Sequence, residues 1–386
     1  MSAKPQKTIF VQMAMTLFLV FFSISYFSFG WIATVAKTFG DVGAGNTIGV
    51  GGSIGAVCVA GLLTILVSIQ RPLNSAARWP LFCLILLQVS VIWVLESGNR
   101  FDCNYSSLMV YVVCICHAIL SSIVITLECT RVLKNSGSNF RLFRTFGSLG
   151  YASAALTNQV LAGAAWMTIA PIALFLTLLL RPTNCETLGN DTAARSIPKE
   201  TAGGFVATNE MWRLYGVSFL LAFCATPFQA FGVIELRNQA GGLCWLAVLI
   251  VAEVAFLAAI PIERIRLVSK GAGLIWAIAY WMLSSPSSWG LLGAVTLIAL
   301  ACPMQTAVQA ELHRCCVDSR WAATAQGMLS VAASLGGFVC ATFVSTWETA
   351  TPIDVWKGAV AMCLAVTPLI IIASSKRYLR REKSVS

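Results

Sequence analysis

The sequence predicts an all-α integral membrane protein with twelve transmembrane helices in two six-helix, pseudo-symmetric halves. The composition gives the first reason. Of the 386 residues, 58% are hydrophobic and 11% are charged, whereas a soluble domain carries about 25% charged residues. A chain of this composition cannot cover itself with a polar surface, so we expect it in a lipid bilayer.

About twelve apolar runs approach the length of a membrane-spanning helix, which needs roughly 20 residues. They cover residues 9–36, 46–69, 79–95, 106–132, 142–163 and 166–180 in the first half, and residues 215–233, 241–260, 271–283, 290–310, 321–346 and 355–373 in the second. No run shows the short alternating pattern of a membrane barrel strand. The first run is too long for the core of a signal peptide, so we expect an uncleaved helix.

The placement of basic residues supports this count. With both termini in the cytoplasm, all of the 26 Lys and Arg residues except Lys37, Arg100, Arg237 and Lys357 fall in inner segments. This split follows the positive-inside rule. It predicts a multi-pass protein of the cell (inner) membrane with both termini cytoplasmic. The net charge of +10 then reflects topology and requires no nucleic acid, and the basic tail is expected beside anionic lipid head groups.

One long polar stretch near the middle divides the chain. We expect a six-helix half at residues 1–182, a cytoplasmic central loop at 183–212, and a second six-helix half with the basic cytoplasmic tail at 213–386. Two parallel repeats of this kind place a binding site at their interface near the middle of the membrane. The fifth helix of each half is rich in small residues, in "TFGSLGYASAA" and "AQGMLSVAASLGG", which let helix backbones approach closely.

Three stretches carry a family resemblance. They are "NFRLFRTFGSLGYASAA", "VLIVAEVAFLAAIPIERI" and "CVDSRWAATAQGMLSVAASLGG". In order and separation they resemble the fifth, eighth and eleventh helices of one group of the major facilitator superfamily. That group contains the lactose permease, the nucleoside:proton symporters and the phenylpropionate-permease-like carriers. The resemblance covers essentially the whole chain and implies a monomeric transporter that rocks two halves around a central site.

Charges inside the spans are the first candidates for that site. Each costs about 2.5–3.5 kcal/mol or more at a helix centre, so such charges usually face a cavity and a partner. Glu128, late in the fourth run, and Arg144, early in the fifth, flank one short loop. The resemblance implies that an acid and an arginine at these places lie at the substrate or coupling site. We predict a Glu128–Arg144 pair; the alternative is that both side chains extend to the cytoplasmic face.

Glu253 lies in the middle of the eighth run, with at least eight uncharged residues on either side. Burial disfavours the charged form of a carboxyl group, so an unpaired Glu253 is expected to bind a proton. That property suits a proton-coupled carrier. The alternative is a permanently protonated glutamate that hydrogen-bonds a neighbouring helix.

Polar and aromatic side chains in otherwise apolar runs are further candidates. Aromatic faces combined with amide groups suit a sugar, a nucleoside or an aromatic acid. For the tyrosine in the first helix, a packing or interfacial role is an equal alternative. The glutamine of "CATPFQAFG" follows a proline that is expected to kink its helix. These residues are Tyr26, Asn158, Gln229 and Gln305.

The sequence departs from the resembled group at the positions associated with coupling. The arginine common in the ninth helix is Tyr280 here. The His and Glu that the lactose-permease branch carries in the tenth helix align with Ile298 and Ala301. These departures are also compatible with an uncoupled facilitator, a different coupling ion or a transporter-derived protein that no longer transports. Tyr280 is kept as a candidate because of its position.

No pattern in the sequence predicts an enzyme, a cofactor or a metal site. The 14 cysteines show no metal-binding spacing and behave as small hydrophobic residues. A Ser/His/Asp set, a Walker loop and a paired-carboxylate motif are also missing. The sequence thus predicts a secondary active transporter, a proton symporter for a small organic solute such as a nucleoside, a sugar or an aromatic acid. The alternative is a transporter-derived membrane receptor or sensor, or an uncoupled facilitator.

The topology can be tested in a variant whose 14 native cysteines, including Cys185 in the stretch between Arg181 and Arg213, are replaced and which carries one cysteine introduced into that stretch. An impermeant thiol reagent is expected to leave this cysteine unlabelled in intact cells and to label it in inverted vesicles. Labelling from outside intact cells would overturn the twelve-span scheme.

Overall fold

The computed structural model describes most of the chain. The described residues are 9–32, 35–36, 40, 78–101, 107–136, 140–161, 165–181, 208–285, 287–315, 322–345 and 351–374. The predicted span at 46–69, most of the central loop and the basic tail lie outside them. The described part of every other predicted span is mainly helix.

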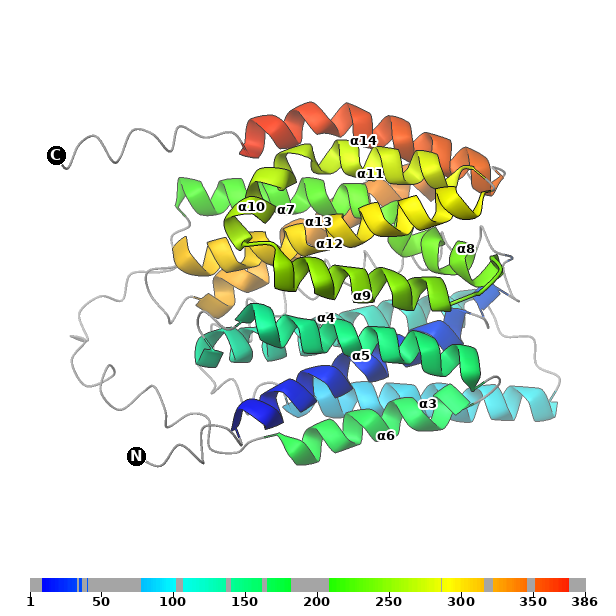
Figure 1. The fold of residues 1–386 in the computed structure, drawn as a ribbon. Helices are drawn as coiled ribbons and strands as arrows, with labels where there is room; N and C mark the ends of the chain where they lie inside the picture. The colour runs from blue at the N-terminus through cyan, green and yellow to red at the C-terminus, as the bar shows by residue number, and fades with distance from the viewer. Residues whose placement is uncertain are drawn as a thin grey trace, which may run out of the picture.

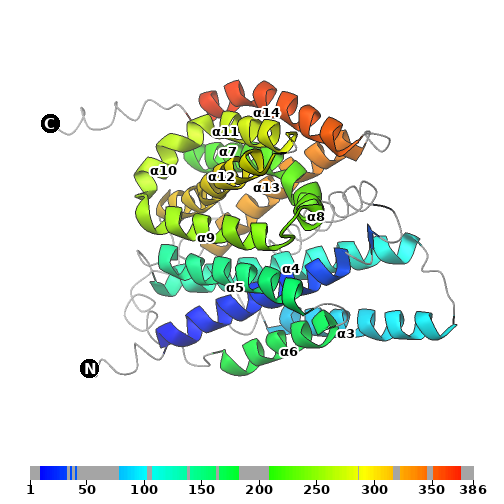
Figure 2. The same ribbon diagram turned by 45° about the vertical axis from the view of Figure 1, so that its right-hand side comes forward.

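The described helices pack in two layers, and each layer consists of helices that are consecutive in the sequence. The first layer holds the helix Ile9–Ile32, α3 (Arg78–Phe101), α4 (Ser107–Ser136), α5 (Phe140–Val160) and α6 (Ala165–Leu180). The second holds α7 (Asn209–Pro227), the π-helix η2 (Phe228–Gly232), α8 (Val233–Asn238), α9 (Cys244–Ala259), α10 (Ile262–Val268), the short 3₁₀ turn η3 (Ser269–Gly271), α11 (Ala272–Leu283), α12 (Ser288–Cys315), α13 (Ala322–Ser345) and α14 (Pro352–Ser374). Figures 1 and 2 show the layers side by side.

The described helices have the dimensions of a membrane protein. Six of them are long and apolar enough to cross a bilayer: Ile9–Ile32, Leu108–Cys129, Asn209–Asn238, Ser288–Leu312, Ala325–Val344 and Ile353–Ser374. The first helix begins and α14 ends at the same end of the bundle (Figure 1). The described chain therefore returns to the side from which it starts.

Glycines allow the closest helix contacts, as the small-residue pattern predicts. A Cβ atom at Gly150 of α5 would overlap the carbonyl oxygen of Phe18 on the first helix. A Cβ at Gly336 of α13 would overlap the carbonyl oxygen of Phe219 on α7. The fifth helix of each half thus meets the first helix of the same half in the same way. Backbone contacts of this kind exclude any side chain larger than hydrogen.

Polar contacts between described residues join the layers. The Ser148 hydroxyl of α5 donates to Oε1 of Glu253 on α9 at 3.2 Å. Near the end of α5, Oε1 of Gln159 accepts a hydrogen bond from the backbone N–H of Leu243 at 3.2 Å. The hydroxyls of Thr126 on α4 and Ser330 on α13 lie 3.4 Å apart.

The predicted span at 215–233 differs from an ordinary helix. Pro227 lies inside it, and the winding changes from α to π over Phe228–Gly232 before α8 continues. Proline lacks the N–H that would continue the ladder, and its ring crowds the preceding turn. Where the sequence predicts a kink after the proline, the structure has this π segment.

The Gly150 contact predicts a large effect of one added methyl group. Gly150→Ala is expected to lower the melting temperature of the purified protein, because the obstructing atom is backbone and overpacking costs about 1–3 kcal/mol. Gly216→Ala in α7 is the matched control, since nothing lies within 4 Å of its added Cβ. Equal melting temperatures for the two variants would contradict the close contact.

Candidate functional site

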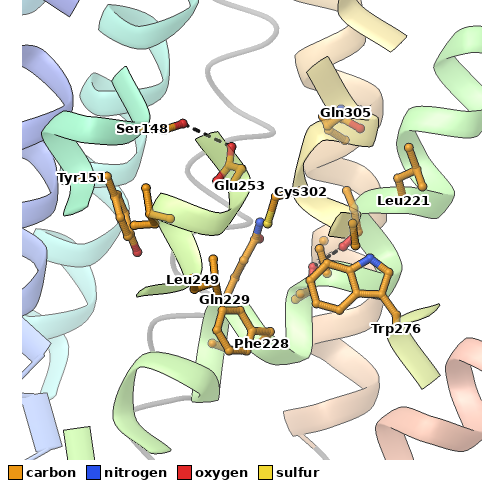
Figure 3. Close-up of a pocket in the computed structure, with 18 of the residues that line it drawn as sticks. Ser148, Tyr151, Leu221, Phe228, Gln229, Leu249, Glu253, Trp276, Cys302 and Gln305 are labelled. Atoms are coloured by element: carbon orange, nitrogen blue, oxygen red, sulfur yellow. Dashed lines mark hydrogen bonds between the residues drawn. The ribbon is translucent and has the colours of Figure 1, made fainter. Parts of the chain in front are cut away.

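A cavity of about 620 Å³ lies between the layers. Its wall includes Phe21 of the first helix, residues of α5, α7, η2 and α9, Trp276 of α11, and residues of α12 and α13. Figure 3 shows side chains from both layers pointing towards it. A cavity is thus present between the two layers, where the sequence predicts a binding site.

Glu253 reaches the cavity from α9. Buried residues of this helix recur at Leu246, Leu249, Ile250, Glu253 and Leu257, which is the spacing of one helix face. The carboxyl group stands on this buried face and is therefore directed to the interior of the protein. The residue is 8% exposed, and the hydroxyl of Ser148 donates to its carboxyl group from the opposite layer.

Arg144 lies on α5, one turn before Ser148, so both side chains project from the same face of that helix. Its Cζ is 4.7 Å from the centroid of the Phe21 ring, a cation–π contact. Its Nη1 is buried with no hydrogen-bond partner among the described residues. The described residues provide no ion pair for Arg144 within 4.0 Å.

Gly147 explains how this arginine fits. A Cβ at that position would lie 3.0 Å from the Phe21 ring and 3.3 Å from Nη1 of Arg144. The missing side chain therefore leaves the space that the ring and the guanidinium occupy. This accounts for a glycine so close to a charged residue in the α5 sequence.

The predicted Glu128–Arg144 pair is wrong. Glu128 is 1% exposed, and its Oε2 lies 2.8 Å from Nη2 of Arg131 while its Oε1 lies 3.1 Å from Nη2 of Arg181. Arg131 also donates from Nη2 to the hydroxyl of Thr16 at 2.9 Å. Glu128 thus faces the first helix and the end of α6 instead of α5. For Glu128 the alternative of extension to the surface is also wrong, since this residue is buried.

The amide candidates divide into two groups. Gln229 of η2 and Gln305 of α12 line the cavity. Nε2 of Gln305 donates to the hydroxyl of Ser218, and its Oε1 is buried without a partner among the described residues. Asn158 is not part of the cavity wall, and it is the neighbouring Gln159 that bridges the two layers.

The tyrosine candidates lie away from the cavity. Tyr26 is fully buried, stacks on Phe22 with ring centroids 5.5 Å apart, and has a hydroxyl with no described partner. Tyr280 is also fully buried and lies behind the wall. Its hydroxyl donates to the carbonyl of Cys224 at 2.6 Å and accepts from the N–H of Phe228 at 3.2 Å.

Comparison with solved structures identifies the architecture. The nucleoside transporter NupG superposes with a TM-score of 0.63 at 17% identity, covering 95% of this chain and 99% of that one. The human organic anion transporter MFSD10 gives 0.68 at 14% identity, with 96% and 100% covered. A bacterial homologue of the iron transporter ferroportin, in the outward-facing state, gives 0.64 at 14%, with 95% and 98% covered. No family model and no curated protein matches the sequence.

The chain has the major facilitator fold. The expected fold is confirmed over nearly its whole length. In this fold the fifth and eighth spans correspond to α5 and α9, so the Ser148–Glu253 hydrogen bond joins the two halves beside the central cavity.

Sequence reasoning missed several residues of the major facilitator cavity. Phe21, Ser148, Tyr151, Trp276 and Cys302 line it. One signal was available: "SLG" occurs at Ser148–Gly150 and again at 334–336, and both serines line the cavity. The aromatic residues carried no comparable signal, since aromatic side chains are common throughout these helices. Among the described residues no group of three His, Cys, Asp or Glu side chains could hold a metal ion.

The buried cluster around Glu128 predicts a stability effect. Glu128→Gln leaves two buried guanidinium groups facing a neutral amide, and breaking a buried ion pair costs about 3–5 kcal/mol. The melting temperature in detergent is expected to fall sharply. Glu235→Gln is the control, because the contact of Glu235 with Gln239 is exposed. A Glu128→Gln protein as stable as the control would contradict the role of the cluster.

Proposed function

We propose that this chain is a secondary active transporter that moves a small organic solute across the cell (inner) membrane by alternating access. It acts as a monomer, with both termini cytoplasmic. The observation that supports this proposal is the cavity between the two halves, which combines Arg144 from one half with Glu253 from the other. A carrier of this kind binds its solute between halves that separate alternately on each side.

The cavity suits a small organic molecule. Ligand pockets usually span about 300–1,000 Å³, with mainly apolar walls and a few polar groups that fix orientation. Tyr151, Phe228 and Trp276 provide aromatic surface here, and Gln229 and Gln305 provide amides. These groups favour a nucleoside, a sugar or an aromatic acid. The names of two structural neighbours, the nucleoside transporter NupG and the organic anion transporter MFSD10, agree with two of these three classes.

Arg144 is the group that we expect to orient the solute. A guanidinium presents several N–H donors in a planar fork that matches carboxylates and pairs of oxygens. Its contact with the Phe21 ring holds the cation but uses none of these donors. A solute oxygen therefore supplies the hydrogen bonds that the described protein does not.

Glu253 is the group that we expect to bind the coupling proton. An ionised carboxylate in a buried, apolar site is costly unless it is paired, and the Ser148 hydroxyl is its one hydrogen-bond partner among the described residues. Protonation removes this cost and leaves a neutral carboxyl group beside α5. Because Ser148 and Glu253 lie on opposite halves, movement of α5 against α9 changes the surroundings of the proton-binding group.

Transport of a labelled panel into proteoliposomes tests the proposal. Uridine, methyl β-D-galactopyranoside and 3-phenylpropanoate represent the three classes, each tested with and without an inward proton gradient. At least one is expected to accumulate against its gradient. Saturable binding without uptake of any member would instead favour the receptor alternative.

Glu253→Gln separates coupling from binding. The amide keeps the size of the side chain and fixes the neutral state, so accumulation driven by protons is expected to be abolished while downhill exchange persists. Glu235→Gln, remote from the cavity, is expected to behave as the wild type. If Glu253→Gln concentrates its solute with unchanged pH dependence, Glu253 is not the proton carrier.

A further inference from the structure

We infer that Tyr280 is a positioning residue for the cavity. Its hydroxyl takes the place of a backbone hydrogen bond at the break between α7 and η2 and so holds Phe228 and Gln229 in the cavity wall. The role of Gln229 in solute recognition rests on the proposed function. The geometric part, that Tyr280 sets the direction of Gln229, does not.

The hydrogen bonds around Pro227 place Tyr280 inside the helix ladder. In a regular α-helix the N–H of Phe228 would donate to the carbonyl of Cys224, four residues back. Instead it reaches the carbonyl of Ala225 and the Tyr280 hydroxyl. The same hydroxyl donates to the carbonyl of Cys224 at 2.6 Å. The backbone hydrogen bond from Phe228 to Cys224 is therefore missing, and the Tyr280 hydroxyl replaces it by bonding to both of these backbone groups.

An internal repeat explains why the ladder opens there. The first helix reads "FLVFFSISYFSFG" from Phe18 to Gly30, and α7 continuing into η2 reads "FLLAFCATPFQAFG" from Phe219 to Gly232. The second stretch has one residue more. A single extra residue in a helix is accommodated as a π-bulge, and η2 is such a π segment.

The helix packing fixes the register of this repeat independently of the sequence similarity. Gly150 meets the carbonyl of Phe18, and Gly336 meets the carbonyl of Phe219. Both glycines end an identical "SLG" in the fifth helix of their halves. The two phenylalanines are therefore equivalent positions, and the extra residue lies beyond them, before Gly232.

The inserted residue changes what faces the cavity. At Ser28 of the first helix, which matches Gln229 in this register, the hydroxyl bonds back to the carbonyl of Ile24 in its own helix. Phe228 and Gln229, on the π segment, line the cavity instead. Figure 3 shows Gln229 projecting towards Glu253 and Cys302.

The Tyr280 ring is itself firmly held. It stacks between Trp276 and Trp356, with ring centroids 5.5 Å and 5.6 Å away, and is fully buried. Loss of the hydroxyl alone therefore leaves the ring in place. Without the hydroxyl, the Phe228 N–H and the Cys224 carbonyl can approach each other and form the backbone hydrogen bond. The helix then closes at this point, and Gln229 turns away from the cavity.

Cysteine reactivity measures this rotation without any solute. Gln229→Cys is introduced into the full-length purified protein, and its modification by N-ethylmaleimide is followed peptide by peptide by mass spectrometry. Cys302, a native cysteine in the same wall, is the internal reference. Adding Tyr280→Phe is expected to lower the reactivity of the introduced cysteine, relative to that of Cys302, about fivefold, as loss of one buried hydrogen bond allows.

Two further variants separate positioning from general stability. Ser23→Ala removes another buried hydroxyl-to-carbonyl bond between helices, to Ala170 at 2.7 Å, and is expected to leave the reactivity ratio unchanged. Deleting Ala230 gives the segment the residue count of the first helix and is expected to lower the ratio as Tyr280→Phe does.

The inference fails if Tyr280→Phe leaves the reactivity ratio unchanged, or if it lowers both cysteines equally. It also fails if the Ala230 deletion leaves the ratio as in the protein that carries Gln229→Cys alone. None of these outcomes depends on uptake. A lowered ratio in a protein that transports no member of the solute panel would support the geometry and count against the proposed function alone.

Discussion

A charge that a helix carries into a bilayer must be compensated there, and this constraint organises the described structure. An unpaired charge at the centre of a span costs several kcal/mol. Glu128 forms ion pairs with two buried arginines, Arg131 and Arg181. Glu253 has a single hydroxyl, from Ser148, and Arg144 has the face of an aromatic ring. Glu128 is thus paired within the protein, whereas Arg144 and Glu253 at the cavity have no ion pair among the described residues, so a ligand can add to their contacts.

One face of α5 carries both Arg144 and the serine that binds Glu253. Arg144 and Ser148 are four residues apart and share that face, which contacts α9 of the other half. Gly147 makes room for the guanidinium, and Gly150 lets the helix backbone touch the first helix. The small residues therefore set both the depth of the arginine and the distance between the helices. A larger residue at either glycine would displace the groups that it adjoins.

The sequence was sufficient for the spans but not for the contacts between them. Hydropathy reports whether a residue lies in lipid, so the predicted runs that fall on described residues agree with the helices. It does not report which neighbour a helix face meets. Proximity across one short loop predicts that Glu128 pairs with Arg144, whereas one of the two partners of Glu128, Arg181, lies far along the chain at the end of α6. Glu253 could be placed because a lone acid in a long apolar run has few alternatives.

Tyr280 shows a second limit of such reasoning. Its position in the ninth span suggests a cavity residue. Its hydroxyl instead bonds to backbone groups at the break between α7 and η2. The stretch of α7 and η2 has one residue more than the matching stretch of the first helix, and this extra residue marks the break. The two stretches can be aligned only when the contacts of Gly150 and Gly336 fix their register.

The same register shows why the two halves are alike in backbone and different in chemistry. Gly150 and Gly336 touch backbone, so any side chain there is excluded and the small residue is retained in both halves. Ser148 and Ser334 occupy equivalent places in the cavity wall, but the first bonds across the interface to Glu253 and the second bonds back to Ser330 in its own helix. Backbone contacts constrain a position more tightly than cavity contacts do. Two repeats can therefore keep one packing scheme while the groups that meet a solute diverge.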